Sequence, residues 1–502
     1  MGFGLIDITA KRAGLTPHRT AFEDGLSGRR VTYAELEDRS ARCAGVFALL
    51  GVTRRDRVAI LCRNRIEFFE AIFACAKLGA ILVPLNWRAP AAELAPLLDD
   101  CTPRVLVFGA EDTEIAGALK HPGLRTLALD VDYQARLDAA SPAQTDARWS
   151  GEAIWTLLYT SGTTGQPKAV IQTYQMAAVN AFHATQAFGL RAGDRTLNFL
   201  PLFHTAGIQL LTMPVLIAGG TVTVLPNFDA GRTLEIAARL DAFFAVPAVY
   251  QQLALHPRFE ETDLSRVRAW GCGGAPLPDV LVERFAAKGA AVCNGYGMTE
   301  TGPTAFIAAP EDALAHIGSV GKPQMLLEAR IVDLQGREVG AGETGEIWMR
   351  GPGLTPGYWN KPEETANAFT ADGWLRSGDL ARCDSEGRYQ VVGRIKEMYI
   401  SGGENVYPAE VENVLARHPG VLEAAIIGVP DAQWGEVGHA FVLVRPETPA
   451  PELSELERHC RANLAAYKVP RAFVLVAEFP RTASGKVRKH LLHDQALLHC
   501  KQ

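Results

Sequence analysis

Long apolar segments and paired cysteines are the two features that this chain of 502 residues most clearly lacks. Its most apolar stretch, residues 209–225, is interrupted by Pro214, Gly219 and Gly220, so the sequence predicts no transmembrane segment. The nine cysteines are scattered and never spaced as CxxC, which argues against a disulfide framework or a structural zinc site. The chain is therefore expected to lie in a reducing cytoplasm.

The chain also has little excess of charge of either sign. Lys and Arg number 50 against 56 Asp and Glu, a net charge of −6, so the chain is not a globally basic nucleic-acid binder and no nucleic-acid partner is expected. It contains no repeat of 20–50 residues and no low-complexity segment. Because 48% of its residues are hydrophobic and only 21% are charged, we expect a folded chain with a sizeable core.

Hydrophobic periodicity predicts layered α/β structure in the first part of the chain. Residues 33–50 and 66–78 have the pattern of amphipathic or buried helices, and each is followed by a short apolar strand, at 57–61 and 80–84. Strand–helix–strand units at this spacing favour parallel sheets covered by helices. Further strands of the same kind are predicted at 104–108, 221–225 and 242–246.

The pattern changes after Gly318. Short strands at 328–332, 345–350 and 387–392 stand between glycine-rich turns, which predicts a small antiparallel, β-barrel-like part. Helix–strand alternation returns from Tyr407. We therefore expect a large N-terminal domain, residues 1–395, and a small C-terminal α/β domain, residues 396–502, joined where glycine and charged residues cluster.

The strongest chemical signal is the string at residues 159–168, Tyr-Thr-Ser-Gly-Thr-Thr-Gly-Gln-Pro-Lys. It follows a predicted strand at 154–159. Small residues let backbone N–H groups face outward, and the hydroxyl groups add donors, so such a loop can bind polyphosphate. It is not a Walker A loop, because Gly-Lys-Ser/Thr is missing at the required spacing.

This string, together with others from residues 32–36 to residues 484–486, resembles the adenylate-forming superfamily. That superfamily includes acyl-CoA synthetases, carrier-loading adenylation domains and firefly-type luciferases. The resemblance covers nearly the whole chain and is close to the 4-chlorobenzoate–CoA ligases and medium-chain acyl-CoA ligases. It implies that the N-terminal domain binds ATP and that the C-terminal domain is mobile.

The resemblance implies a nucleotide site built from several strings. The phosphate loop would contribute Thr160, Ser161, Gly162, Thr163, Thr164, Gly165 and Lys168, with Thr163 among the catalytic residues. The adenine side would be formed by Gly273, Gly274, Ala275 and Pro276 and by Asn294, Gly295, Tyr296, Gly297, Met298 and Thr299. Tyr296 would stack on adenine, Thr299 would bind phosphate, and Glu300 would hold Mg²⁺ as a hard oxygen ligand.

Four more residues take roles from the same resemblance. Asp379 would accept hydrogen bonds from the ribose hydroxyls, and Arg394 would donate to ribose or phosphate. Lys486 would neutralise the charge that develops between the substrate carboxylate and the α-phosphate. Lys396 occupies the hinge position of the family.

The acyl and CoA sites are implied less specifically. His204 aligns with an aromatic or histidine residue that gates the acyl pocket, and the other pocket candidates are Phe182, Thr205, Gly207, Val246, Gly273 and Pro303. None of them carries a positive charge, which predicts a monocarboxylic acid with an apolar tail. The candidates for CoA binding are Arg88, Gly402, Gly403, Trp434 and Arg471, although Val469 stands where the chlorobenzoate ligase has arginine.

The sequence therefore predicts an AMP-forming acyl-CoA synthetase that uses ATP, Mg²⁺ and coenzyme A. The alternative is an adenylation enzyme that loads a carboxylate onto a carrier protein. A luciferase-like oxygenase and a non-catalytic nucleotide-binding protein are less favoured, and the latter would be expected to have lost Lys486 or Glu300. The sequence is compatible with a homodimer, and it does not identify the acid.

Overall fold

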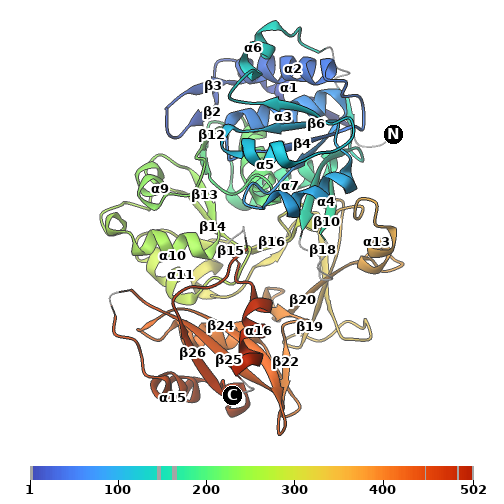
Figure 1. The fold of residues 1–502 in the computed structure, drawn as a ribbon. Helices are drawn as coiled ribbons and strands as arrows, with labels where there is room; N and C mark the ends of the chain where they lie inside the picture. The colour runs from blue at the N-terminus through green and yellow to red at the C-terminus, as the bar shows by residue number, and fades with distance from the viewer. Residues whose placement is uncertain (1–3, 144–147, 161–166, 447, 483–485, 500–502) are drawn as a thin grey trace.

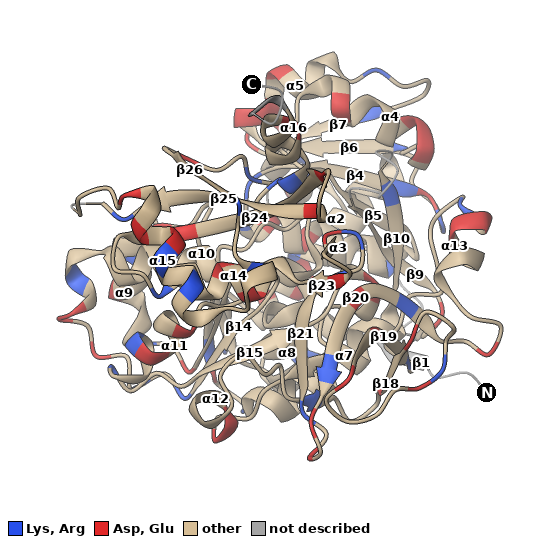
Figure 2. Ribbon diagram, turned by 90° about the horizontal axis from the view of Figure 1, so that it is seen from below, with Lys and Arg blue, Asp and Glu red and all other residues tan. Residues whose placement is uncertain are grey.

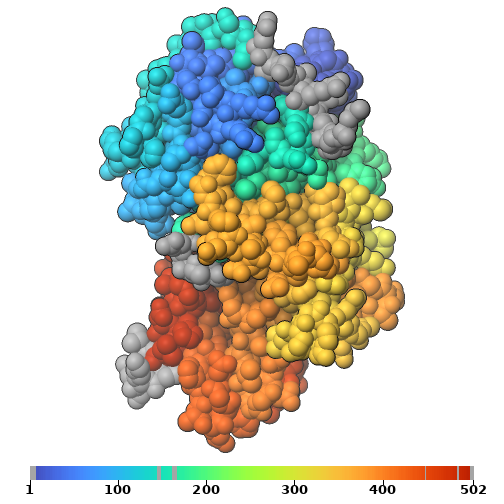
Figure 3. Space-filling view, turned by 90° about the vertical axis from the view of Figure 1, so that its right-hand side faces the viewer, coloured from blue at the N-terminus to red at the C-terminus, as the bar shows by residue number. Residues whose placement is uncertain are grey.

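A computed structural model of the chain describes residues 4–143, 148–160, 167–446, 448–482 and 486–499. Two α/β sheets with their helices form the upper part in Figure 1, a third α/β sheet and an antiparallel sheet follow below them, and the C-terminal residues form the lower end. Figure 3 shows the same succession on another face, with the yellow and orange middle region between the blue N-terminal and red C-terminal residues.

A six-stranded sheet supports the phosphate loop, and it has the order β10-β9-β5-β4-β6-β7. Its strands are β4 (Arg57–Leu61), β5 (Ile81–Pro84), β6 (Val105–Phe108), β7 (Arg125–Ala128), β9 (Ile154–Thr160) and β10 (Lys168–Thr173). All neighbours are parallel except β9 and β10. The sequence predicted β4, β5 and β6 within one residue at each end, because strands that are buried on both faces are continuously apolar.

Helices α2 (Tyr33–Leu49) and α3 (Ile66–Leu78) also follow the prediction closely. The Thr32 hydroxyl accepts a hydrogen bond from the Glu35 N–H, and the Glu35 carboxylate accepts one from the Thr32 N–H, so a capping box starts α2. Helix α3 ends where Gly79 adopts a left-handed conformation. These local signals explain why both boundaries could be read from the sequence.

Two more sheets complete the α/β part, in the orders β11-β12-β2-β3 and β13-β14-β15-β16-β17. The first contains β2 (Thr20–Asp24), β3 (Arg30–Thr32), β11 (Arg195–Asn198) and β12 (Thr221–Val224). The second contains β13 (Ala242–Ala245), β14 (Ala269–Cys272), β15 (Val292–Tyr296), β16 (Phe306–Ile307) and β17 (Lys322–Pro323). The helices after α3 in this part are α4 (Ala91–Cys101), α5 (Thr113–Ala118), α6 (Tyr133–Ala139), α7 (Tyr174–Phe188), α8 (Thr212–Ala218), α9 (Ala230–Ala237), α10 (Pro247–Leu255), α11 (Asp279–Ala286) and α12 (Asp312–Ala315).

The antiparallel part is an open sheet, so the expectation of a barrel-like segment was wrong. It contains β18 (Glu328–Val332), β19 (Thr344–Arg350), β20 (Leu375–Cys383) and β21 (Tyr389–Arg394), paired in chain order. Four strands are too few to close around an interior filled by side chains. The predicted strands and their antiparallel character are confirmed, whereas closure depends on strand number and tilt, which the turns do not reveal.

The C-terminal residues form a unit with its own core. Its sheet has the order β23-β22-β25-β24, and β26 pairs with β25. The elements are β22 (Tyr399–Ser401), β23 (Glu404–Val406), α14 (Pro408–Ala416), β24 (Val421–Asp431), β25 (Gly435–Val444), α15 (Leu453–Asn463), β26 (Ala472–Val476) and α16 (Lys489–His499). Among the described residues, no hydrophobic cluster contains members from both sides of Lys396.

The remaining elements are short or peripheral: β1 (Gly4–Ile6), α1 (Ile8–Leu15), β8 (Arg148–Ser150) and α13 (Pro362–Ala368). A π-helical turn covers residues 206–210, and 3₁₀ turns cover 110–112, 257–259, 299–301 and 466–468. In the ranges that the structure describes, no helix combines the length and the apolar character needed to cross a membrane.

Candidate active site

The two ends of the predicted phosphate loop are held by the antiparallel strands β9 and β10. The Thr160 hydroxyl donates a hydrogen bond to the Lys168 carbonyl over 3.3 Å. The Lys168 ammonium lies 5.4 Å from the centre of the Tyr358 ring. The other predicted loop residues, at positions 161–165, lie outside the described residues.

Glu300 is buried next to this loop, in the short 3₁₀ turn that follows β15. Its side chain accepts a 2.9 Å hydrogen bond from the Tyr358 hydroxyl, and its backbone carbonyl accepts one from the Thr355 N–H at 2.8 Å. Burial raises the pKa of Glu300, while its hydrogen bonds act in the opposite direction. In the described part of the chain, Tyr358 is the one side chain that hydrogen-bonds the Glu300 carboxylate. A buried carboxylate whose partner is neutral gains from a nearby cation.

Asp379 is held by Tyr296 and Arg394, two other residues predicted for the nucleotide site. The Tyr296 hydroxyl donates to one carboxylate oxygen over 2.7 Å, and the Arg394 Nε donates to the other over 2.9 Å. Strands β20 and β21 place Asp379 directly opposite Arg394. Both carboxylate oxygens are thereby fixed in orientation. Each can still accept a hydrogen bond from one hydroxyl of a diol such as that of ribose.

The adenine-side strings lie at adjoining strand ends. The segment 273–276 follows β14, and the segment 294–299 runs from the parallel strand β15 into the turn with Glu300. A Cβ atom at Gly297 would lie 1.7 Å from the Pro303 carbonyl oxygen, so only glycine fits there. The Thr299 carbonyl accepts a 2.7 Å hydrogen bond from the Gln172 side chain, which ties this turn to β10.

Lys486 reaches this site from the C-terminal unit. Residues 481 and 487 pair as an isolated antiparallel bridge, and the Lys486 N–H donates to the Thr482 hydroxyl over 3.1 Å. Although the residue is solvent-exposed, the pKa of Lys486 is lowered, first by desolvation and then by the charge of Arg394. The carboxylates of Asp379 and Glu300 act on it in the opposite direction, so the ammonium lies within the field of both predicted nucleotide-site acids.

The positive charge of Lys486 also acts on His204. Its pKa is lowered to about 4, mainly by desolvation and further by the charges of Lys486 and Arg88. The Nε2 atom is buried and has no hydrogen-bond partner among the described residues. At neutral pH the imidazole is therefore uncharged, which fits a pocket wall better than a general base.

Four of the predicted CoA-binding positions lie within the C-terminal unit. The Gly402 N–H donates to the Trp434 carbonyl over 2.8 Å, and a Cβ at Gly402 would lie 2.7 Å from the indole ring. Arg471 lies close enough to Asp431, near Trp434, to lower the pKa of that carboxyl, together with two backbone N–H groups. Gly403 is exposed beside them.

Arg88 belongs to a different place, in the N-terminal part. It follows β5 and stacks on Trp87, with 4.7 Å between the guanidinium and the ring centre. Arg63 stacks on the same ring at the same distance. The positive charge of Arg88 contributes to the lowered pKa of His204.

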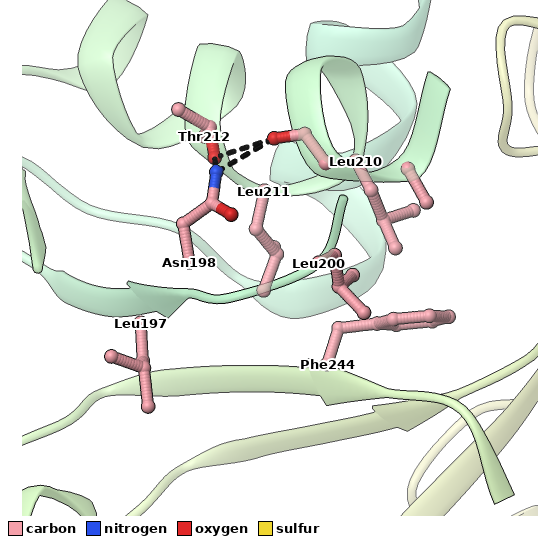
Figure 4. Close-up of a pocket in the computed structure, with 9 residues that line it drawn as sticks. Leu197, Asn198, Leu200, Leu210, Leu211, Thr212 and Phe244 are labelled. Carbon is pink, nitrogen blue, oxygen red and sulfur yellow. Dashed lines mark hydrogen bonds between the residues drawn. The ribbon is translucent and has the colours of Figure 1, made fainter. Parts of the chain in front are cut away.

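Two of the acyl-pocket candidates, Thr205 and Gly207, lie in the segment directly after His204. The Gly207 carbonyl accepts a 2.7 Å hydrogen bond from the Asn198 side chain. A cavity of about 10 Å³ is lined by Gly207, Leu200, Phe244 and Thr212 among others (Figure 4). That volume suits about one water molecule and no acyl group. Phe182, on α7, is 41% exposed. Thr205 is buried, and its hydroxyl has no partner in the described ranges.

Sequence reasoning missed two residues of this site. Tyr358 contacts both Lys168 and Glu300, although nothing in its sequence context distinguishes it from an ordinary half-buried aromatic residue. Gln172 is a buried polar residue that directly follows the apolar residues 169–171 of β10, and that contrast was a usable signal. Trp359, which follows Tyr358, pairs by its backbone N–H with Ala169 and brings this segment against β10.

Comparison with known proteins assigns the family. Residues 9–359 match the AMP-binding enzyme family, and residues 410–486 match the AMP-binding enzyme C-terminal domain. The chain belongs to this family and is an acyl-CoA synthetase of the adenylate-forming superfamily. The feruloyl-CoA synthase of Amycolatopsis sp is 40% identical over 488 residues, which cover 97% of this chain and 98% of that protein.

Solved structures agree with the assignment and bear on the arrangement of the domains. MatB from Rhodopseudomonas palustris bound to ATP superposes with a TM-score of 0.91 at 31% identity, covering 98% of this chain and 99% of MatB. The apo form of MatB gives 0.80 at 30% identity, with the same coverage. The anthranilate CoA ligase AuaEII in complex with anthranoyl-AMP gives 0.93 at 29% identity, covering 100% and 98% of the two chains.

Proposed function

We propose that this acyl-CoA synthetase activates a monocarboxylic acid with an apolar, aryl-containing tail. The enzyme forms an acyl-adenylate and pyrophosphate from the acid and ATP, and then transfers the acyl group to coenzyme A with release of AMP. The observation that carries the assignment of roles is the convergence of Lys486 from the C-terminal unit with Glu300, Asp379 and His204.

The choice of acid rests on the pocket residues and on the relatives. Phe182, Val246 and Pro303 are apolar and Thr205 is neutral, so a second carboxylate on the tail would be left without a partner. Besides feruloyl-CoA synthase, an indoleacetate–CoA ligase of Aromatoleum aromaticum is 38% identical over 492 residues. Both names describe acids whose carboxylate is attached to an aromatic body.

In the first half-reaction, a carboxylate oxygen of the acid attacks the α-phosphorus and the bond to pyrophosphate breaks. Lys486 offsets the negative charge that builds up between the two groups. Asp379, held by Tyr296 and Arg394, receives the ribose hydroxyls. No general base is required, because the substrate carboxylate is already ionised at neutral pH, and the uncharged His204 shapes the acyl side.

Glu300 is the residue proposed to hold Mg²⁺. In the described part of the chain no group of three acidic, histidine or cysteine residues could hold a metal ion, so an all-protein cage is not available there. Mg²⁺ is commonly held by one carboxylate, waters and substrate phosphates, and a single buried Glu300 fits that arrangement. When bound, the ion supplies charge neutralisation for the phosphates.

In the second half-reaction, the thiol of coenzyme A attacks the acyl carbonyl and the bond to AMP breaks. Gly402, Gly403 and Trp434 are the proposed CoA contacts, and they lie beside β22 and β25, whereas Lys486 lies in the segment before α16. We therefore propose that the unit beyond Lys396 turns between two poses, with Lys486 inward for adenylation and Gly403 inward for thiolation. Each hydrophobic cluster of the described residues lies wholly on one side of Lys396, which supports a rigid-body turn there.

A panel of acids tests the substrate proposal. The purified enzyme with ATP, Mg²⁺ and coenzyme A should form AMP and acyl-CoA faster with ferulate, indoleacetate or phenylacetate than with malonate or succinate. Mass spectrometry of the thioester identifies coenzyme A as the acceptor. A preference for the dicarboxylic acids would contradict the proposal, because it would require a cation that the proposed pocket lacks.

A further inference from the structure

One corner of the C-terminal unit rests on two helices of the N-terminal part. This corner, residues 417–422, connects α14 to β24, and its partners are α10 and α11 (Figure 2). No hydrophobic cluster of the described residues crosses Lys396. Polar contacts therefore contribute more to holding the two parts together than they would across a shared hydrophobic core.

The first contact is an ion pair between Arg417 and Asp279. Asp279 stands in the first turn of α11, and Arg417 directly follows the last residue of α14. Each charge thus sits at the end of its own helix where the helix dipole favours it. The Arg417 side chain is 59% exposed and that of Asp279 is 17% exposed.

The second contact joins α10 to the start of β24. The Gln251 side chain donates a 2.8 Å hydrogen bond to the Leu422 carbonyl. The pairing of β24 with β25 shifts register between Val421 and Glu423, so Leu422 is skipped in the ladder. A carbonyl at this irregularity is available to a partner outside the sheet.

We propose that these two contacts form a latch that holds the C-terminal unit in the adenylation pose and sets the balance between the half-reactions. The inference rests on the two-pose function proposed above. In the pose observed, Lys486 acts on His204 while the corner is docked. A turn about Lys396 that brings Gly403 inward carries the corner away from α10 and α11, so both contacts must break.

The strength of the latch suits a step that has to be reversible. An exposed ion pair shifts an equilibrium by about two- to fivefold, and a hydrogen bond to a backbone carbonyl by a similar factor. Such contacts bias a population without freezing it. Residues 417 and 279 are therefore positioning residues, which act on the chemistry by keeping Lys486 in place.

Single-turnover assays of each half-reaction test the latch. Arg417→Ala should slow acyl-adenylate formation about two- to fivefold, while the conversion of supplied acyl-adenylate and coenzyme A to thioester stays equal or becomes faster. Adding Gln251→Ala should slow adenylation by about fivefold more. Arg417→Lys should restore part of the adenylation rate, because it keeps the charge.

Arg461→Ala is the matched control, because Arg461 forms an ion pair of similar exposure with Glu457 inside α15. The adenylation ratio of wild type to Arg417→Ala should approach one as salt rises from about 0.1 to 1 M, since screening shortens from about 10 to 3 Å. Equal losses in both half-reactions, or an Arg417→Ala enzyme that behaves like Arg461→Ala, would overturn the latch. A wild-type enzyme that makes no acyl-adenylate would instead overturn the proposed function.

Discussion

His204 shows at the scale of a single residue how the site controls charge. Its pKa of about 4 has two causes, burial and the nearby charges of Lys486 and Arg88. Because this value lies below the ordinary value near 6.5, the unfolded chain takes up the proton first. The contribution of His204 to stability is therefore lost as the pH falls from about 6.5 through 4.

This gives a prediction about titration. An NMR titration, with His204→Phe used to assign the imidazole signal, should give a midpoint near 4 for His204, so that its charge does not change between pH 5 and 8. Lys486→Ala should raise the midpoint, because one nearby positive charge is removed. A midpoint at or above 6.5, or no response to Lys486→Ala, would place Lys486 away from His204 in solution.

Residue types in the motif strings could be predicted, but their contacts could not. Glu300 and Asp379 were recognised from local strings, since those strings contain the chemistry. Their partners Tyr358 and Tyr296 are 58 and 83 residues away in the chain. Only the folded sheets bring such positions together, and the orientation of each carboxylate therefore became visible only in the structure.

At the scale of elements, the signals that worked were local. The capping box at Thr32 and the left-handed Gly79 fix α2 and α3, and continuous apolar runs fix β4 and β6. The barrel-like expectation failed because strand pairing is a long-range property. Antiparallel strands look alike in the sequence whether their sheet closes or stays open.

Helix α3 carries an element-scale prediction through Lys77. Its ammonium bonds Asp7 at 2.6 Å and Glu37 at 2.7 Å, with only 1% of the side chain exposed. Lys77→Ala leaves these carboxylates without their cation, so the free energy of unfolding should fall by about 3–5 kcal/mol. Urea unfolding followed by tryptophan fluorescence measures this change.

The matched control is Arg136→Ala, which removes an exposed ion pair with Asp132 on α6. It should change the free energy of unfolding by no more than about 1 kcal/mol. If Lys77→Ala and Arg136→Ala lowered the free energy of unfolding by the same amount, the buried ion pairs of Lys77 would add no more stability than an exposed pair. The N-terminal helices would then be held by apolar packing alone.

At the scale of the whole molecule, the structure captures one arrangement of two units. Lys486 lies in the field of Asp379 and Glu300, and its charge acts on His204. The chain superposes better on ATP-bound MatB than on the apo form. The sequence indicated two domains and a linker by a change of pattern near residue 396. It could not indicate which surface of the small unit faces the large one, because that depends on contacts such as Arg417 with Asp279.

The separation of the two half-reactions by residue is the most direct test of this account. Single-turnover assays should show that Lys486→Ala abolishes acyl-adenylate formation but still converts supplied acyl-adenylate and coenzyme A to thioester. Lys396→Pro, which fixes φ at the proposed hinge, should form the adenylate but hardly any thioester. Equal damage to both half-reactions by Lys486→Ala would contradict the account, because the lysine would then serve one structural role in a single fixed arrangement.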